Sequence, residues 1–447
     1  MSGSNAVGAL VLSVLLPVSG CGFFGEGEDD PGVDHRVYEG EAPAYEVPGS
    51  VSRVAWEWEV PDQENSLVDV LPGRSGPVMV LGDGLVGLDG ATGEELWHYR
   101  LEGGGVHGAW VTPEGEEILL SLPGAEPDSV VLLDAGTGRL LAENEMILRR
   151  KGSAPHATVT SQVVVPPPQG EGPVEAFSFR EGERVWSYVP AGRADGTEVL
   201  VEDVVSAGDT VVVVMAHGLA GLEHESGDLI EQGMLVVGLD GETGEPVWEV
   251  EQEFMDESYR VAKHELSPGA EVLFLEVGVG DQRHEFLIDP ATGAEIEGAA
   301  YQEPERYRVG LLDDGYVETA ADYDAGTVEY WYTSFEGEEV YRSEVGLRPA
   351  EGSIDRGLLL EEGVLRTDYL TDPDLDRGPV NVEFARWGED GDPLVLKADM
   401  TANEEWWLES KGSVMYSLPD APVLVPVPGA VVVTEENRGP WTVTGLV

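Results

Sequence analysis

Short apolar runs separated by polar turns dominate the chain beyond residue 50. Examples are the runs at 77–81 (PVMVL), 117–121 (EILLS), 210–215 (TVVVVM) and 272–276 (VLFLE). They are apolar at nearly every position and lack the 3.6-residue period of an amphipathic helix, which is typical of strands covered on both faces. The pattern predicts an all-β protein built from many short strands.

One polar motif punctuates these strands repeatedly. The stretch VGLDGATGEELW at 86–97 recurs as VGLDGETGEPVW at 237–248, with weaker copies at 133–141, 177–186, 288–296 and 334–341. In such a motif the Asp side chain can accept the N–H groups of the turn, Thr can cap it, and Gly supplies a positive φ. We therefore expect a hairpin corner, followed by a strand whose large aromatic residue docks against a neighbouring repeat.

The spacing of the corners sets the architecture. Asp89 and Asp134 are 45 residues apart, and Asp240 and Asp289 are 49 apart. A period of about 45–50 residues with four strands in each repeat indicates a β-propeller. Corners fall near residues 89, 134, 180, 240, 289, 336 and 388.

The end of the chain lacks a final corner. Strands at 430–434 and 441–447 have none after them, whereas the strand at 53–60 (RVAWEWEV) carries the Trp pattern with no corner before it. We expect this N-terminal strand to complete the C-terminal blade and close an eight-bladed propeller, with seven blades as the alternative. Pro246 fits this arrangement only in an outermost strand.

The pattern Leu-Asp-x-x-Thr-Gly-x-x-x-Trp resembles the repeat of the PQQ-binding-like (quinoprotein alcohol dehydrogenase-like) propellers. This superfamily includes the outer-membrane-assembly propeller lipoprotein and the quinoprotein dehydrogenases. Its enzymes hold PQQ with calcium over a central tryptophan, beneath a ring of two adjacent cysteines. Because this chain has a single cysteine, we assign no PQQ-binding residue and expect no cofactor.

The N-terminus indicates export and lipidation. The uncharged apolar run at 6–18 is too short to span a bilayer but suits the core of a signal peptide, although the residues before it carry no Lys or Arg. Val18-Ser-Gly-Cys21 follows and resembles the lipobox of bacterial lipoproteins. That resemblance implies a signal peptide at 1–20 and a diacylglyceryl group on Cys21, and two acyl chains anchor a protein stably.

The next segment is strongly acidic and contains several Pro and Gly residues. Such a composition buries too little apolar surface to offset the entropy of ordering. The sequence therefore predicts a flexible acidic tether over 21–50, followed by the propeller over 51–447.

Charge limits the partners of the protein. The chain has 86 Asp and Glu residues against 25 Lys and Arg, a formal net charge of −61. Such a surface repels polyphosphates, so nucleic acid is a poor candidate and we expect no nucleic-acid partner. Adaptation to a salty or alkaline environment explains this acidity better than any specific partner does.

Candidate chemistry is sparse. Asp372, Asp374 and Asp376, with Glu383 further on, approximate a calcium loop, but Arg377 stands where the turn needs Gly. They form a weak calcium candidate, and no other metal site and no catalytic residue is assigned. The histidines lack metal-binding spacing and are expected in turns or on the surface, among them His107, His156, His217, His224, His264 and His284. An insertion at 218–232 is either a functional loop or a solvated hairpin extension.

These observations favour a non-catalytic, lipid-anchored binding or scaffolding protein on the extracytoplasmic face of the cell membrane. Its partner would be an envelope protein or a small ligand, met by the blade-connecting loops and the channel mouth. The alternative is an enzyme, either a diverged quinoprotein dehydrogenase or another propeller enzyme. A third possibility is a role in assembling envelope proteins by strand addition to an outer blade edge.

Overall fold

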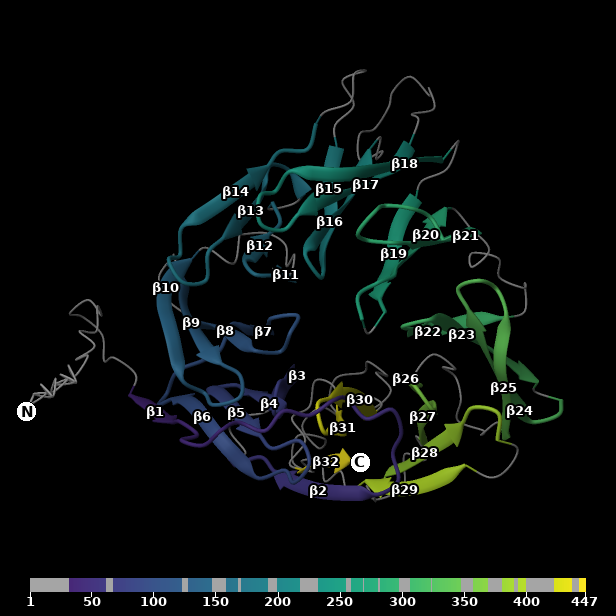
Figure 1. Cartoon of the computed structure of the whole chain (residues 1–447), viewed down its shortest axis with the longest axis horizontal. Helices are drawn as coiled ribbons and strands as arrows, with labels where there is room; N and C mark the ends of the chain where they lie inside the picture. Colours follow the sequence, from purple (N-terminus) through teal and green to yellow (C-terminus); the bar gives the residue numbers. More distant parts are fainter. Residues whose placement is uncertain are drawn as a thin grey trace, which may run out of the picture.

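Eight β-sheets stand around a central channel in the computed structural model (Figure 1). The structure describes residues 32–61, 67–122, 128–146, 158–167, 170–191, 199–217, 232–254, 259–267, 269–279, 282–296, 306–322, 324–346, 357–368, 380–389, 393–398, 422–435 and 442–447. The eight sheets confirm the all-β, eight-bladed propeller and exclude the seven-bladed alternative.

Each blade is numbered in chain order and its strands run outward from the channel. Blade 1 has β3 (Leu67–Gly73), β4 (Gly76–Leu81), β5 (Gly84–Leu88) and β6 (Glu95–Leu101). Blade 2 has β7 (Gly108–Val111), β8 (Glu117–Leu122), β9 (Asp128–Asp134) and β10 (Leu140–Met146). Blade 3 has β11 (Thr158–Val159), β12 (Val163–Val165), β13 (Val174–Phe177) and β14 (Arg184–Tyr188). Blade 4 has β15 (Val199–Ala207), β16 (Thr210–His217), β17 (Gln232–Asp240) and β18 (Pro246–Phe254).

The second half of the ring follows the same order. Blade 5 has β19 (Tyr259–Leu266), β20 (Leu273–Val279) and β21 (Gln282–Ile288). Blade 6 has β22 (Tyr307–Leu312), β23 (Gly315–Asp322), β24 (Thr327–Ser334) and β25 (Glu339–Gly346). Blade 7 has β26 (Leu358–Leu360), β27 (Gly363–Asp368), β28 (Val380–Arg386) and β29 (Leu394–Ala398). Blade 8 has β30 (Pro422–Val427), β31 (Ala430–Glu435), β32 (Thr442–Leu446) and the N-terminal strand β2 (Val54–Glu59).

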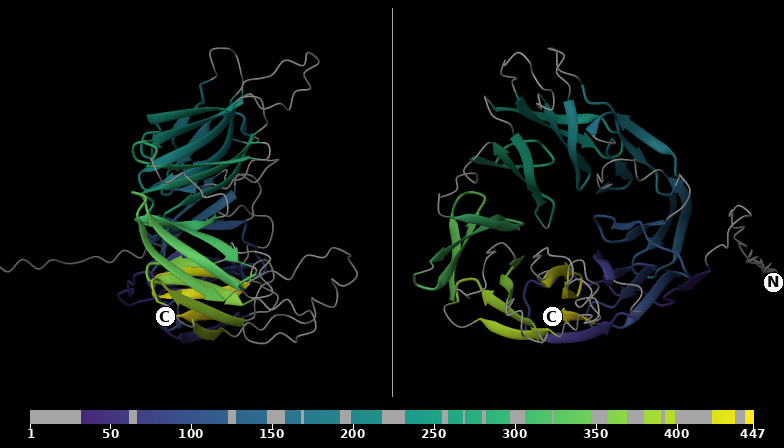
Figure 2. Two further views of the ribbon diagram at one scale, coloured as in Figure 1. Left: turned by 90° about the vertical axis from the view of Figure 1, so that its right-hand side faces the viewer. Right: turned by 180° about the vertical axis from the view of Figure 1, so that it is seen from behind.

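Strand β2 closes the ring as predicted. It pairs antiparallel with β32, with Trp56 opposite Gly445 and Trp58 opposite Val443. Both tryptophans are buried in a cluster that joins blade 8 to blade 1. Figures 1 and 2 show β2 and β32 side by side at the base of the ring. The two ends of the propeller are therefore joined in one antiparallel sheet, which leaves no unpaired strand edge between them.

The strongly apolar runs occupy the second strand of a blade, not the innermost one. β4 and β16 are buried along almost their whole length. The innermost strand β3 instead mixes buried and exposed residues, with Val68 63% exposed. The reason is that second strands are covered by neighbouring blades on both faces, whereas innermost strands border the channel.

The tether predicted over residues 21–50 is wrong in its second half. β1 (Val33–Arg36) pairs antiparallel with β6 and becomes a fifth strand of blade 1. Residues 37–50, here called the N-terminal strap, then run across the ring, and Tyr38 packs on the blade 1 core. A few apolar side chains suffice to hold this acidic segment because a strand edge is available to pair with it. Residues 1–31, including the predicted signal peptide and Cys21, lie outside the described residues.

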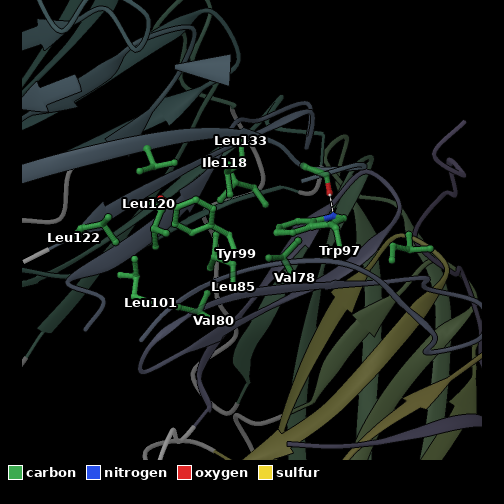
Figure 3. Packing of buried hydrophobic residues seen from close by; sticks show 13 residues of the cluster. Val78, Val80, Leu85, Trp97, Tyr99, Leu101, Ile118, Leu120, Leu122 and Leu133 are labelled. Atoms are coloured by element: carbon green, nitrogen blue, oxygen red, sulfur yellow. Dashed lines mark hydrogen bonds between the residues drawn. The ribbon is translucent and has the colours of Figure 1, made fainter. Parts of the chain in front are cut away.

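Tryptophans lock neighbouring blades together, as the corner motif predicted. Trp97 of β6 is fully buried, and its Nε1 donates a hydrogen bond to the Ala135 carbonyl of blade 2, 3.0 Å away (Figure 3). A Cβ at Gly138 in that corner would come within 2.6 Å of the Trp97 ring. The lock therefore requires glycine at this point.

The same lock recurs at three other interfaces of the ring. The indole Nε1 atoms of Trp56, Trp186 and Trp248 donate to the carbonyls of Gly90, Gly241 and Pro290 at 2.8, 3.0 and 2.8 Å. Between blades 2 and 3, Asn144 takes this role and donates to the Phe179 carbonyl at 2.7 Å. The aromatic position is thus a device for joining blades.

The corners have the predicted chemistry. Asp89 Oδ1 accepts the N–H groups of Ala91 and Thr92 at 3.0 and 2.9 Å and the Thr92 hydroxyl at 3.0 Å. Gly93 follows at φ 70°, a conformation that favours glycine. The described corners lie on one face of the ring, together with the turns between first and second strands, because strands alternate in direction within a blade. This is the corner face.

Candidate functional site: the central cavity

The innermost strands of all eight blades enclose a cavity of about 2150 Å³ that opens on the corner face. One residue from each blade illustrates its wall: Leu71, Val111, Thr158, Ser206, Leu266, Leu312, Leu359 and Pro426. Pockets for small ligands usually measure about 300–1,000 Å³. The cavity is therefore large enough for a polypeptide segment or a side-chain cluster of a partner.

The N-terminal strap forms part of the mouth of the cavity. Tyr45 and Val47 line it, and the strap is fixed to three turns of the corner face. Ser75 Oγ donates to the Pro43 carbonyl at 2.6 Å, the Gly429 N–H to Glu46 at 2.9 Å, and the Glu362 N–H to Gly49 at 2.8 Å. The strap thereby links blades 1, 8 and 7 across the mouth.

Apolar and acidic groups dominate the described lining. Its aromatic residues are Tyr45, Trp110, Tyr332 and Tyr341, and its carboxylates are Asp69, Glu114, Glu265, Asp313, Asp314 and Glu361. Arg74 and His107 are the basic side chains among the described lining residues. The mouth therefore carries a negative potential that attracts cationic ligands and repels anions.

Several of these groups also hold the cavity wall in shape. Glu265 Oε1 accepts the Leu311 N–H at 3.1 Å, and Asp313 Oδ1 accepts the Gly269 N–H at 2.6 Å, so both carboxylates join blade 5 to blade 6. Burial raises the pKa of Tyr332, as does its hydrogen bond to Asp314. Burial also raises the pKa of Asp69, against the effect of the Val70 N–H. The acidic lining is thus partly structural.

The cavity does not fit the cofactor of the superfamily enzymes. PQQ carries three carboxylate groups, whereas this lining offers Arg74 and His107 against six carboxylates. Bringing a tricarboxylate into such a field costs free energy unless cations compensate it.

The weak calcium candidate is only partly described. Asp372, Asp374 and Asp376 lie outside the described residues. Glu383 lies on β28, buried at 2% exposure, and its Oε2 pairs with the Arg366 guanidinium at 3.0 Å. It therefore serves a cross-strand ion pair. Within the described ranges, no group of three or more His, Cys, Asp or Glu residues is placed to hold a metal ion.

Two histidines differ from the expectation of surface or turn positions. His107 lines the cavity, and His217 is 1% exposed at the end of β16, with its Nε2 3.5 Å from Glu251 Oε1. His156 and His224 lie outside the described residues. The spacing of histidines in the sequence did not predict the positions of His107 and His217, because their surroundings come from other strands.

The predicted insertion does lie between two apolar strands of blade 4, namely β16 and β17. Residues 218–231 themselves are outside the described ranges. In the part of the chain that the structure describes, no helix has the length and apolar character needed to cross a membrane.

A sequence profile described as "Outer membrane protein assembly factor BamB" matches residues 82–261 and 126–315, together just over half of the chain. The chain belongs to this family. The matched region runs from the turn between β4 and β5 of blade 1 to the first residue of β23 in blade 6, so it covers the tryptophan locks of blades 1, 3 and 4. The resemblance inferred from the repeated motif is therefore confirmed.

Solved structures of other propellers are also similar to this chain. BamB from Moraxella catarrhalis is 15% identical with a TM-score of 0.43, over 89% of this chain and 99% of that one. Quinohemoprotein alcohol dehydrogenase from Comamonas testosteroni is 13% identical with a TM-score of 0.39, over 88% and 76%. The search of curated proteins gave no match. At these TM-scores the fold rests on the sheet topology and not on the neighbours.

Proposed function

We propose that this protein is a lipid-anchored, extracytoplasmic propeller that acts as a non-catalytic binding or scaffolding protein of the cell envelope. The observation that carries the proposal is the family match over residues 82–315, because the family is described as an outer membrane protein assembly factor. The Val18-Ser-Gly-Cys21 motif supports the anchor, which places the protein on the extracytoplasmic face of the cell membrane.

The cavity supports a polypeptide partner in preference to a metabolite. Its volume of about 2150 Å³ exceeds that of a small-molecule pocket, and its wall combines aliphatic and aromatic side chains with carboxylates. A segment with apolar and basic residues would complement both features. The proposed partner is therefore an envelope protein, bound without a cofactor and without nucleic acid.

Crosslinking in intact cells tests the binding role. The full chain, carrying a photoreactive residue at Val68 in the cavity, is expected to form adducts with envelope proteins. The same group at Gly103, an exposed turn residue with no atom within 4 Å of its Cβ position, serves as the matched control. Equal adducts from both positions would contradict the proposal.

Lipidation and catalysis are tested separately. Cys21→Ala is expected to move the protein from the membrane to the soluble fraction, and unchanged membrane retention would contradict the anchor. Equilibrium dialysis with PQQ and calcium, followed by dye-linked oxidation of alcohols, is expected to show neither uptake nor turnover. Turnover would establish the diverged-dehydrogenase alternative.

A further inference from the structure

Blade 1 shows what the outer edge of a blade in this protein can bind. Its fourth strand, β6, pairs with the chain's own β1, with Val33 opposite Leu101 and Arg36 opposite His98. Among the described residues, the outer strands of blades 3, 4 and 6 are the last strands of their sheets. An extended segment can therefore add to such an edge, and in blade 1 it does so within one chain.

A repeated aliphatic residue marks these edges. In β6, Leu96 sits at a bulge immediately before Trp97, between the pairs Leu88–Glu95 and Gly87–Trp97. The same bulge position is occupied by Val185, Val247 and Val340 in β14, β18 and β25. The position can thus be compared between blades by register alone.

The exposure of this residue differs between blade 1, which carries the N-terminal segment, and the other three blades. Leu96 is 7% exposed and belongs to a cluster against which Tyr38 packs. Val185, Val247 and Val340 are 47%, 54% and 42% exposed. The same apolar position is covered where β1 and the strap lie and is open to solvent on the other three blades.

We propose that β18 of blade 4 binds an extended, basic segment of a partner protein as a fifth antiparallel strand. This inference rests on the proposed binding function and names the chemistry of one partner segment. β18 presents the most exposed of the bulge residues, Val247, and at nine residues it is longer than β14 and β25. Backbone pairing along a strand edge gives affinity, and side-chain contacts give specificity.

The charges on β18 select a basic segment. In blade 1, Asp34 of the added strand lies opposite Arg100, and its Oδ1 is 3.3 Å from His98 Nε2. Counted from the tryptophan, Glu249 and Glu251 of β18 replace His98 and Arg100. Glu249 is exposed, and Glu251, which also contacts His217, is 41% exposed. An acid at the position of Asp34 would be repelled there, whereas Lys or Arg would be attracted.

The apolar anchor completes the recognition pattern. In blade 1 the residue that reaches the Leu96 cluster is Tyr38, four positions after Asp34. The segment that fits β18 therefore carries a basic residue followed four positions later by an aromatic or aliphatic one. By the blade 1 register, the basic residue would lie opposite Glu251 and within reach of Glu249, as Asp34 lies opposite Arg100 and contacts His98. The apolar residue would cover Val247.

Two peptides test this pattern. The first has the sequence of residues 32–40 (GVDHRVYEG), and the second is the same peptide with Asp34→Lys. Fluorescence anisotropy with the purified full chain is expected to show at least about tenfold tighter binding of the lysine peptide. A photoreactive group on that peptide is expected to crosslink to β18.

Two variants of the protein locate the site. Val247→Ala is expected to weaken binding of the lysine peptide about fivefold, through lost apolar contact. Glu249→Lys is expected to weaken it about tenfold, whereas Glu245→Lys, the same charge change at an exposed corner residue of the same blade, changes it less than about twofold. Thermal unfolding of each variant confirms that it is folded.

The outcomes separate this inference from the proposed function. Any one of four results would overturn the edge site. These are equal binding of the two peptides, no binding of either peptide, crosslinks to the central cavity or to β6, and undiminished binding of the lysine peptide by the Glu249→Lys variant. If envelope proteins still crosslink to the cavity in cells, the binding function stands without it. If the lysine peptide binds β18 but no envelope protein is captured, the edge site stands and the proposed function fails.

Discussion

Two interfaces of the same ring are joined by opposite chemistry. Between blades 1 and 2, the fully buried Trp97 lies between Gly87 of its own sheet and Gly138 of the next corner. Between blades 5 and 6, the 3% exposed side chain of Arg308 lies 4.9 Å and 4.6 Å from the Phe274 and Tyr316 rings. Its NH1 is 3.1 Å from Glu285 Oε2.

The difference between these interfaces shows that the tryptophan of the repeat motif serves to join neighbouring blades. Eight residues after the corner aspartate, where blade 1 has Trp97, the blade 5 sequence has Glu297, so this position offers no indole to reach blade 6. An arginine from blade 6 instead reaches back between two aromatic rings, paired with a buried carboxylate. The tryptophan lock depends on shape, whereas the arginine contact depends on keeping both charges together.

Removing the indole should have the largest effect. Trp97→Ala is expected to lower the free energy of unfolding by about 3–5 kcal/mol, because it empties a closed site. Trp248, which is partly exposed at the blade 4 and 5 interface, gives the comparison. Trp248→Ala should cost less, as measured by denaturant unfolding, and an equal loss at both positions would contradict the burial argument.

At the arginine interface, a single substitution and a double substitution should change the free energy of unfolding differently. Arg308→Met leaves Glu285 buried without this cation and is expected to cost about 3 kcal/mol. The double variant Arg308→Met with Glu285→Leu should recover most of that loss, because it removes both charges of the pair. If the double variant is no more stable than the single one, the interface depends on the ion pair itself.

The steric need for glycine beside Trp97 can be tested by comparison with a glycine that has free space around it. Gly138 and Gly337 have φ values of 69° and 83°, but a Cβ at Gly138 would come within 2.6 Å of Trp97, and a Cβ at Gly337 would meet nothing within 4 Å. Gly337→Ala should cost about 1 kcal/mol for backbone strain alone. Gly138→Ala should cost about 2 kcal/mol more for the displaced indole. Similar losses in thermal unfolding would exclude the steric part.

The smallest effect is expected at the corners. Hydrogen bonds from the Thr243 hydroxyl and the Thr243 N–H lower the pKa of Asp240 in the blade 4 corner. The blade 6 corner has Ser334 at the equivalent position and therefore no carboxyl that titrates. Ionised Asp240 therefore stabilises the fold above its unfolded pKa of about 3.8, and this contribution disappears as pH falls through the lower folded pKa. Asp240→Asn should be less stable than the parent at pH 7 and should approach it near pH 2; a constant difference would exclude linkage to this carboxyl.

Local chemistry made the corners and the closure predictable. In the corner turn the Asp carboxylate accepts hydrogen bonds from backbone N–H groups of the same turn. The turn therefore has the same geometry at Asp89 and at Asp240. An aromatic strand without a corner at one end of the chain and a corner-less blade at the other indicated their pairing. The strand β1 could not be predicted in this way, because its acidic composition suggests a solvated segment until the edge of β6 is there to receive it.

The sequence alone determined the positions of the corners and the strand that closes the ring, since these depend on contacts within a repeat or on its regular spacing, whereas eight blades rather than seven were established by the sheets of the structure. Only the tertiary structure decided the cavity lining, the burial of His217 and the exposure of Val247. Each of these arises where residues far apart in the chain meet, and the exposure of a side chain is fixed by what lies across from it, which no single segment encodes.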